Sequence, residues 1–244
     1  MVLKRFPVQF LVMGDDHQLG AIQNSWVQTV LEVEIGQTTL LKELCDYRRC
    51  VLREGKRSDL ALFDFYSRLA EGELGVQEAR LRFPDKGVAT HSLVISHKRR
   101  VAINRAAQRL RFKEEQPTEF LSLPAVDMEC INETQDMTLW AGVILVAVLP
   151  EKKNGIWNSQ LLKITQVTPL SLECQDTGKT YEVTTDFCQR YLRLSWALTY
   201  ASLQGRTMGH SLRLLDLNHP RMTSKMLLVA LSRARSRELV WLGE

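Results

Sequence analysis

The sequence predicts an α/β fold in which a parallel sheet is interrupted by a small antiparallel β insert. Two observations carry this prediction. The stretch from His91 to Leu110 reads as a strand, a basic turn and a helix, which is one unit of a parallel α/β sheet. Beyond Thr134 the chain changes to short apolar runs separated by turn residues, which is typical of antiparallel strands.

Apolar runs and helical spacing place the individual elements. Before the insert, the sequence predicts a strand at Val8–Met13, a short helix at Ile22–Val30, an apolar element at Leu40–Leu44, an amphipathic helix capped by Ser58 and running to Leu74, a strand at His91–Ser96, a helix at Val101–Leu110 and a strand at Phe120–Val126. After Thr134 it predicts an apolar run at Leu139–Leu149, strands at Leu161–Val167, Ser171–Gln175 and Tyr181–Thr184, a helical segment at Phe187–Ala201, a strand at Leu212–Leu217, a helix at Ser224–Ala234 and a strand at Leu239–Leu242.

Composition bounds the class of protein. Hydrophobic residues make up 45% and charged residues 25% of the chain, as in ordinary folded soluble proteins. A net charge of +4 permits a nucleic-acid partner without requiring one. The 5 cysteines form no C-x-x-C pair, so no zinc or other metal site is expected, and an odd number without a secretory signal predicts reduced thiols in an intracellular protein. No apolar run reaches the ~20 residues that a membrane-spanning helix needs.

Two motifs in the first fifty residues have the chemistry of a nucleotide site. Gly14–Leu19 reads Gly-Asp-Asp-His-Gln-Leu and follows a predicted strand, which directs Asp15 and Gln18 toward the crevice where α/β sheets bind ligands. Arg48, in Tyr-Arg-Arg, has the planar fork that binds phosphate. Each motif alone also fits a plain turn, because Gly-Asp often ends a strand and a basic turn is often simply solvated.

Two further motifs near the C-terminus are more specific as a pair. In Gln204-Gly205-Arg206-Thr207, the glycine lets a backbone approach a phosphate closely. The neighbouring hydroxyl groups that suit a nucleic-acid backbone belong to Thr199, Ser202 and Thr207. Val229–Arg235 is predicted to be a helix with an apolar face and two arginines, Arg233 among them. Taken singly, these motifs also fit a glycine helix cap and a solvated basic face.

The turn after the strand at His91 is a candidate phosphate contact. It contains Ser96, His97, Lys98 and Arg99, although a solvated turn is the alternative. Thr177-Gly178-Lys179-Thr180 is not a phosphate-binding loop, because that loop needs a glycine where Glu173 stands and must lie between a strand and a helix. Strands are predicted on both sides of it, so we expect a hairpin turn.

In their order along the chain, these motifs resemble those of superfamily 1B DNA helicases of the RecD-like, Pif-type branch, which move 5′ to 3′ along single strands. The resemblance implies a RecA-like, P-loop-NTPase-type sheet with an inserted SH3-like β-barrel. It divides the chain into the end of a first RecA-like domain (1–38), a second RecA-like domain (39–133 and 191–244) and the insert (134–190).

The resemblance also implies roles for particular residues. Gln18 is the γ-phosphate sensor, with Asp15 beside it, and Arg48 and Arg233 are catalytic arginines that reach the nucleotide. Gly205, with Gln204, belongs to the motif that couples nucleotide to DNA. The implied contacts to single-stranded DNA are Ser96, His97, Lys98, Arg99, Thr199, Ser202 and Thr207. ATP and Mg²⁺ are the implied cofactors, and the main residues that hold them lie outside this sequence.

The sequence departs from the family pattern in two places. Ala201, Ser202 and Leu203 stand where the family has His-Lys-Ser, and no phosphate-binding loop is present. We therefore expect the C-terminal part of a motor, which is inactive alone as an ATPase and needs a separate N-terminal RecA-like domain or chain. The alternatives are a non-enzymatic nucleic-acid-binding remnant of a decayed or split helicase, and an α/β domain whose motifs are coincidental.

Overall fold

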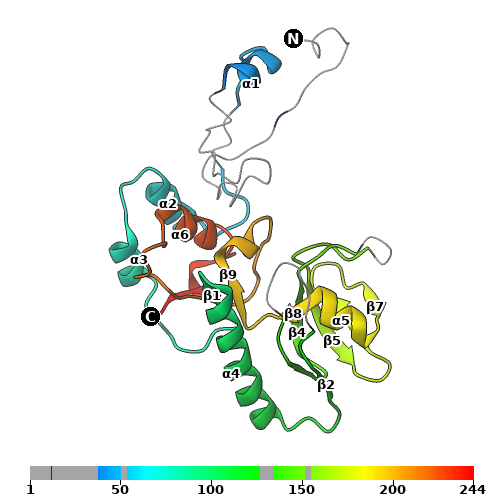
Figure 1. Ribbon diagram of the computed structural model, residues 1–244. Helices are drawn as coiled ribbons and strands as arrows, with labels where there is room; N and C mark the ends of the chain where they lie inside the picture. The colour runs from blue at the N-terminus through cyan, green and yellow to red at the C-terminus, as the bar shows by residue number, and fades with distance from the viewer. Residues whose placement is uncertain (1–11, 13–37, 51–53, 127–133, 152–154) are drawn as a thin grey trace.

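The computed structural model describes residues 12, 38–50, 54–126, 134–151 and 155–244 (Figure 1). Its helices are α1 (Thr39–Leu44), α2 (Leu60–Ala70), α3 (Val76–Arg82), α4 (His97–Glu115), α5 (Thr185–Tyr191), η3 (Tyr200–Leu203), α6 (Ser224–Leu231) and η4 (Arg237–Leu239). Its strands are β1 (His91–Val94), β2 (Leu121–Leu123), β3 (Met137–Leu139), β4 (Ile144–Ala147), β5 (Leu161–Gln166), β6 (Ser171–Cys174), β7 (Thr180–Glu182), β8 (Leu192–Leu194), β9 (Ala197–Thr199), β10 (Leu212–Leu214) and β11 (Val240–Leu242). The strand predicted at Val8–Met13 and the helix predicted at Ile22–Val30 lie outside the described residues.

Four strands form a parallel sheet in the order β11-β10-β1-β9. Helix α4 follows β1 directly and contacts both β1 and β9 (Figure 1). This strand–turn–helix unit confirms the predicted α/β fold with a parallel sheet. None of the helices within the described ranges has the length and apolar character that crossing a lipid bilayer requires.

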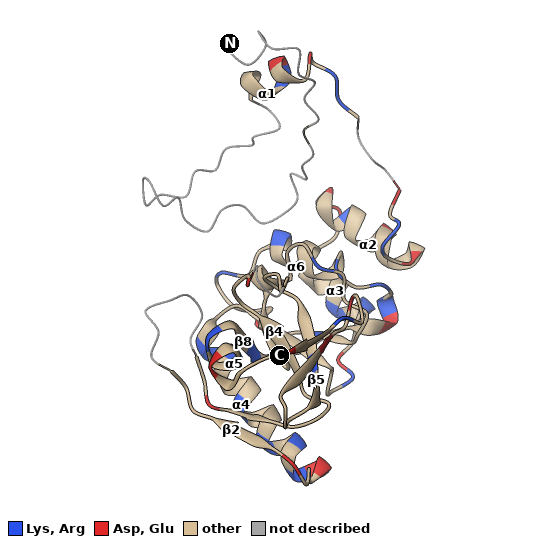
Figure 2. Cartoon of the chain, turned by 90° about the vertical axis from the view of Figure 1, so that its right-hand side faces the viewer, with Lys and Arg blue, Asp and Glu red and all other residues tan. Residues whose placement is uncertain are grey.

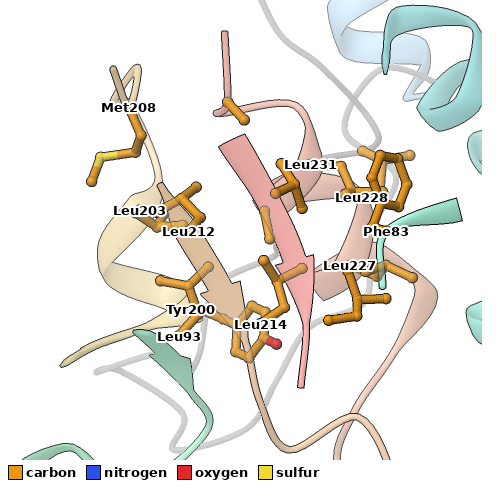
Figure 3. Close-up of a cluster of buried hydrophobic side chains, with 14 of the residues drawn as sticks. Phe83, Leu93, Tyr200, Leu203, Met208, Leu212, Leu214, Leu227, Leu228 and Leu231 are labelled. Carbon is orange, nitrogen blue, oxygen red and sulfur yellow. The ribbon is translucent and has the colours of Figure 1, made fainter. Parts of the chain in front are cut away.

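The core of the parallel sheet is built from leucines on strands and on α6. Figure 3 shows the cluster to which Leu212 and Leu214 of β10 and Leu227 and Leu231 of α6 belong. Tyr200 joins this core and donates a hydrogen bond from its hydroxyl to the Leu215 carbonyl at 2.7 Å. The apolar residues of α6 therefore pack into this core, where the helix contacts α2 and η3.

A second sheet is antiparallel, with the strand order β7-β6-β5-β4-β8. It has a separate core that includes Leu145, Leu162 and Leu172. Strands β2 and β3 pair with each other and bury Leu123 and Leu139 in the same core. The predicted antiparallel strands are confirmed. Residues 175–179 form the turn between β6 and β7, as expected for a hairpin rather than a phosphate-binding loop.

The prediction of one helical segment at Phe187–Ala201 is wrong beyond Tyr191. There α5 ends, and the chain continues as β8, which pairs with β4 in the antiparallel sheet. It then passes to β9, which pairs with β1 in the parallel sheet. Every residue of both strands is buried, so the helical spacing of apolar residues conceals two strands that are covered on both faces.

Helix α4 is longer than predicted and buries a different face. It begins after Ser96, whose hydroxyl accepts from the Arg99 amide at 3.2 Å. Its buried residues are Arg100, Asn104 and Gln108, whereas Leu110 is exposed. The Asn104 amide donates to the carbonyls of Leu194 and Ala197 at 3.0 and 3.1 Å, and its oxygen accepts from the Ala197 amide at 2.7 Å. This polar face of α4 is buried against the segment that connects β8 of the antiparallel sheet to β9 of the parallel sheet.

The helix predicted from a Ser58 cap to Leu74 is two helices. Asp59 is the cap of α2, because its carboxylate accepts from the Leu62 amide at 2.8 Å. Helix α2 ends at Ala70, and Gly72 follows with a φ of 79°, a left-handed backbone that favours glycine. The short helix α3 then begins after Gly75 and was not predicted.

Candidate nucleic-acid and nucleotide interface

The structure brings the two C-terminal motifs side by side. The Met208 amide, directly after Gln204–Thr207, donates to the Arg233 carbonyl at 2.7 Å, and Met208 forms a parallel bridge with Ala234. The prediction that Arg233 lies on a helix is wrong, because α6 ends at Leu231 and Arg233 lies just beyond it. Two segments that are separated by β10 and α6 in sequence thus share one backbone contact.

The N-terminus of α2 holds the segment that carries Arg233. The Ser58 hydroxyl donates to the Ala234 carbonyl at 2.7 Å, and the Asp59 amide donates to the Arg235 carbonyl at 2.8 Å. The Asp59 carboxylate also accepts from the Arg237 amide at 2.7 Å. These bonds fix the backbone that follows Arg233. The Arg233 side chain is buried, with 4% of its surface exposed.

The basic turn lies at the carboxyl end of β1 and begins α4. Ser96 uses its hydroxyl as the helix cap, His97 is half-buried and Lys98 is exposed. Arg99 forms an ion pair with Asp216, which follows β10 and also accepts from the Ile95 amide at 2.8 Å. The turn therefore presents Lys98 to solvent, at a helix N-terminus that favours anions.

The hydroxyl groups predicted beside the coupling motif have mixed surroundings. Thr199 is buried, and its side chain accepts from the Ser202 amide at 3.3 Å, while the Ser202 hydroxyl donates to the Thr199 carbonyl at 2.8 Å. Both hydroxyls thus bond within the η3 turn. Thr199 pairs in register with Val94, which places it at the same sheet edge as the basic turn. Thr207 is exposed.

A cavity of about 500 Å³ lies between the segment Gln204–Met208, called the coupling motif after its predicted role, and the antiparallel insert. Its lining residues are Asn158, Ser159, Gln160, Leu161 and Asp176 from the insert, Gln204, Gly205, Arg206, Thr207 and Met208 from the motif, and Arg235. Gly205 has a φ of 79° and nothing within 4 Å of the place where a Cβ would lie. A backbone or ligand can therefore approach this glycine closely.

Arg206 is the unusual residue of this cavity. Only 9% of its surface is exposed, and none of its three guanidinium nitrogens has a hydrogen-bond partner among the described residues. Burial lowers the pKa of the guanidinium to about 10, while the charge of Asp176 opposes this shift. Arg206 is therefore still a cation near neutral pH. A buried cation without a hydrogen-bonding partner costs several kcal/mol on the order-of-magnitude scale for buried ions.

The predicted nucleotide residues are not all brought together. Asp15 and Gln18 lie outside the described residues. Arg48 is exposed beyond α1, which lies apart from the parallel sheet in Figures 1 and 2. Within the described ranges there is no group of three or more histidine, cysteine or acidic residues that is able to hold a metal ion. These residues do not by themselves fit ATP with Mg²⁺.

Sequence reasoning missed two charged residues of this region. Arg206 lies inside a motif whose glycine and threonine received roles, and its signal was an arginine directly after a flexible glycine. Asp216 comes two residues after β10, where a carboxylate at the carboxyl end of a parallel strand is a signal for a ligand site or a partner loop. In the structure, Asp216 fixes Arg99.

The parallel sheet and the helices that pack on it define an α/β protein. No protein-family model and no curated protein matches the sequence. Among solved structures, the fold is similar to the Pif1 helicase from Bacteroides in complex with ADP-AlF3 and ssDNA, with a TM-score of 0.54, 15% identity, and coverage of 77% of this chain and 50% of that chain. It is also similar to the Pif1 helicase from Candida albicans, with a TM-score of 0.51, 15% identity, and coverage of 75% and 53%.

A third similar structure describes DNA unwinding at forked dsDNA by two coordinating Pif1 helicases. Its TM-score is 0.50 at 16% identity, with coverage of 76% of this chain and 47% of that chain. The chain therefore spans about half the length of the helicase chains that it matches. At this identity the similarity establishes the fold, and it confirms the predicted fold class.

Proposed function

We propose that this chain is the C-terminal motor part of an ATP-dependent 5′ to 3′ DNA helicase of the Pif-type branch of superfamily 1B. In this proposal residues 39–133 and 191–244 form the second RecA-like domain, residues 134–190 form an SH3-like insert, and residues 1–38 end a first RecA-like domain. ATP and Mg²⁺ bind mainly to a partner domain or chain, toward which this part directs Arg48, Arg233, Asp15 and Gln18.

The observation that carries the proposal is the bond between the Met208 amide and the Arg233 carbonyl. A motor must couple the state of its nucleotide to its grip on DNA. A direct backbone contact between the loop that contains Gly205 and the segment that contains Arg233 is suited to this task, because displacement of one moves the other. The bonds from Ser58 and Asp59 keep the Arg233 segment in place.

The proposal predicts that the isolated chain does not hydrolyse ATP. An arginine finger typically raises the rate by about 10³–10⁵, but only for a nucleotide that is already held with its metal. We expect phosphate release from ATP to equal that of an Arg233→Ala variant, in the presence and absence of single-stranded DNA. ATPase activity in the purified chain that disappears in Arg233→Ala would contradict this division of labour.

The proposal also predicts weak, salt-dependent binding of single-stranded DNA, on the order of 10⁻⁴–10⁻⁶ M as for non-specific binding. Lys98→Ala should lower the affinity a few-fold and reduce the slope of log affinity against log salt by about 0.7, the value for one phosphate contact on a single strand. Fluorescence anisotropy with labelled oligothymidine measures both quantities.

Lys113→Ala is the matched control for Lys98→Ala, because this exposed lysine lies in the last turn of the same helix. Arg99 is left intact, since its removal would strip Asp216 of its ion-pair partner. If the two lysine variants bind oligothymidine with equal affinity, the basic turn does not contact DNA. Binding without any salt dependence would contradict the nucleic-acid function as a whole.

A further inference from the structure

The cavity between the coupling motif and the insert has the features of an anion site. Its main cation, Arg206, was not among the predicted site residues. Arg206 is buried at its wall, and its three guanidinium nitrogens have no hydrogen-bond partner among the described residues. Buried polar groups are nearly always hydrogen-bonded, so a cluster of such donors on one side chain indicates a missing partner. The partner must be an anion or a strong acceptor, because a guanidinium only donates.

The charges of the cavity limit what this anion is. Arg206, Arg235 and Asp176 are the charged residues of its lining, which leaves a single net positive charge. Asp176 lies close enough for its charge to act on Arg206. A polyphosphate chain with several negative charges would be repelled by this carboxylate, whereas a phosphodiester has one charge and matches the excess.

The remaining lining residues suit a sugar–phosphate backbone. Asn158 and Gln160 offer amides from the insert, while Thr207 offers an exposed hydroxyl from the motif. The volume of about 500 Å³ falls within the range of roughly 300–1,000 Å³ of small-ligand sites. Nothing lies within 4 Å of the place where a Cβ of Gly205 would be, so a bound strand can approach its backbone closely.

We propose that Arg206 binds a backbone phosphate of a single nucleic-acid strand in this cavity, with the insert forming the opposite wall. The inference rests on the proposed function, because it names a contact within the DNA site of that motor part. It extends the site from the parallel-sheet lobe to the insert. Gln160 and Asp176 line the cavity on the side of the insert, and the carboxylate selects against more highly charged ligands.

Arg206→Gln tests the proposal by anisotropy with oligothymidine between about 50 and 200 mM salt. We expect the affinity to fall about tenfold or more, as for loss of a charge-assisted hydrogen bond, and the salt slope to fall by about 0.7. Arg82→Gln is the control, because it removes one exposed positive charge from α3, away from the cavity. Arg206→Lys should keep the salt slope and recover part of the affinity.

Thermal unfolding separates a binding role from a structural one. An arginine that waits for a ligand leaves the DNA-free protein equally or more stable when it is replaced by glutamine, whereas a structural arginine lowers the Tm. Two results would overturn the Arg206 inference alone. One is an Arg206→Gln variant that binds oligothymidine with the wild-type affinity, and the other is a lower Tm for DNA-free Arg206→Gln. Absence of salt-dependent binding by the wild-type chain would instead overturn the proposed function.

The chemical source of the phosphate is tested with two competitors. An oligothymidine with an uncharged methylphosphonate backbone should bind wild type and Arg206→Gln equally. ATP should displace the labelled strand no better from wild type than from Arg206→Gln. If Arg206→Gln loses affinity for ATP and keeps its affinity for oligothymidine, the cavity belongs to a nucleotide and the proposal is wrong.

Discussion

Asn104→Leu is expected to lower the free energy of unfolding by about 3 kcal/mol or more, with a fall in Tm of about 6–12 °C for a chain of this size. The side chain is fully buried, and its amide bonds the carbonyls of Leu194 and Ala197 and the Ala197 amide. Leucine has a similar size but leaves these backbone groups unsatisfied, at about 1–3 kcal/mol each. Urea unfolding monitored by tryptophan fluorescence measures the change.

Two variants calibrate this effect. Gln108→Met, one turn further along α4, removes a single bond to the Thr138 amide and should cost about 1 kcal/mol. Asn218→Leu removes an exposed contact to Arg80 and should stay within about 0.5 kcal/mol. An Asn104→Leu variant as stable as Asn218→Leu would mean that this side chain does not hold the two sheets together.

Lowering the pH from 7 to 5 is expected to reduce the stability by about 2 kcal/mol through His91 alone. This ring is 1% exposed and bonds the Ser195 carbonyl through Nδ1 at 2.7 Å. Burial is the main cause that lowers the pKa of His91 to about 4. The hydrogen bond to Ser195 opposes this shift, and the charges of His210 and Arg206 add to it. The unfolded chain has a histidine pKa of about 6.5, so it binds the proton first. Stability is therefore complete above about pH 6.5 and is lost as the pH falls toward 4.

Unfolding curves of the His91→Gln variant at pH 7 and pH 5 test this origin. Glutamine keeps a donor for the Ser195 carbonyl but does not titrate, so the pH-dependent loss should shrink by about 2 kcal/mol relative to wild type. His219→Gln, at an exposed position, should keep the wild-type dependence. If His91→Gln loses as much stability as wild type between these pH values, the acid sensitivity has another source.

Local signals predicted much of the fold correctly. The strand–turn–helix beginning at His91 and the antiparallel strands after Thr134 follow from spacing and turn residues, and both are present. The region of Phe187–Ala201 failed because Phe187, Tyr191, Leu194 and Leu198 have helical spacing, while β8 and β9 are buried on both faces. Burial on both faces depends on neighbouring strands, which a local pattern does not contain.

The candidate site shows the same limit. Motif order brought Gly205 and Arg233 to attention, and the structure joins their segments through Met208. The sequence did not predict a role for Arg206, because the cavity beside it is formed with insert residues that are distant in sequence. The basic neighbours of Arg99 predicted that it contacts a phosphate. In the structure Arg99 forms an ion pair with Asp216, which is distant in sequence. The roles of Gln18, Asp15 and Arg48 at a nucleotide remain predictions.

Hydrogen–deuterium exchange of the chain with and without oligothymidine tests the proposed DNA site, because it locates the segments that the bound strand covers. We expect slower amide exchange in two separate segments, residues 97–99 at the start of α4 and residues 205–208 beside Arg233, while exchange in α3 stays unchanged. Slower exchange in neither segment at a saturating oligonucleotide concentration, or only in α3, would contradict the assignment of this chain as the DNA-binding part of a helicase motor.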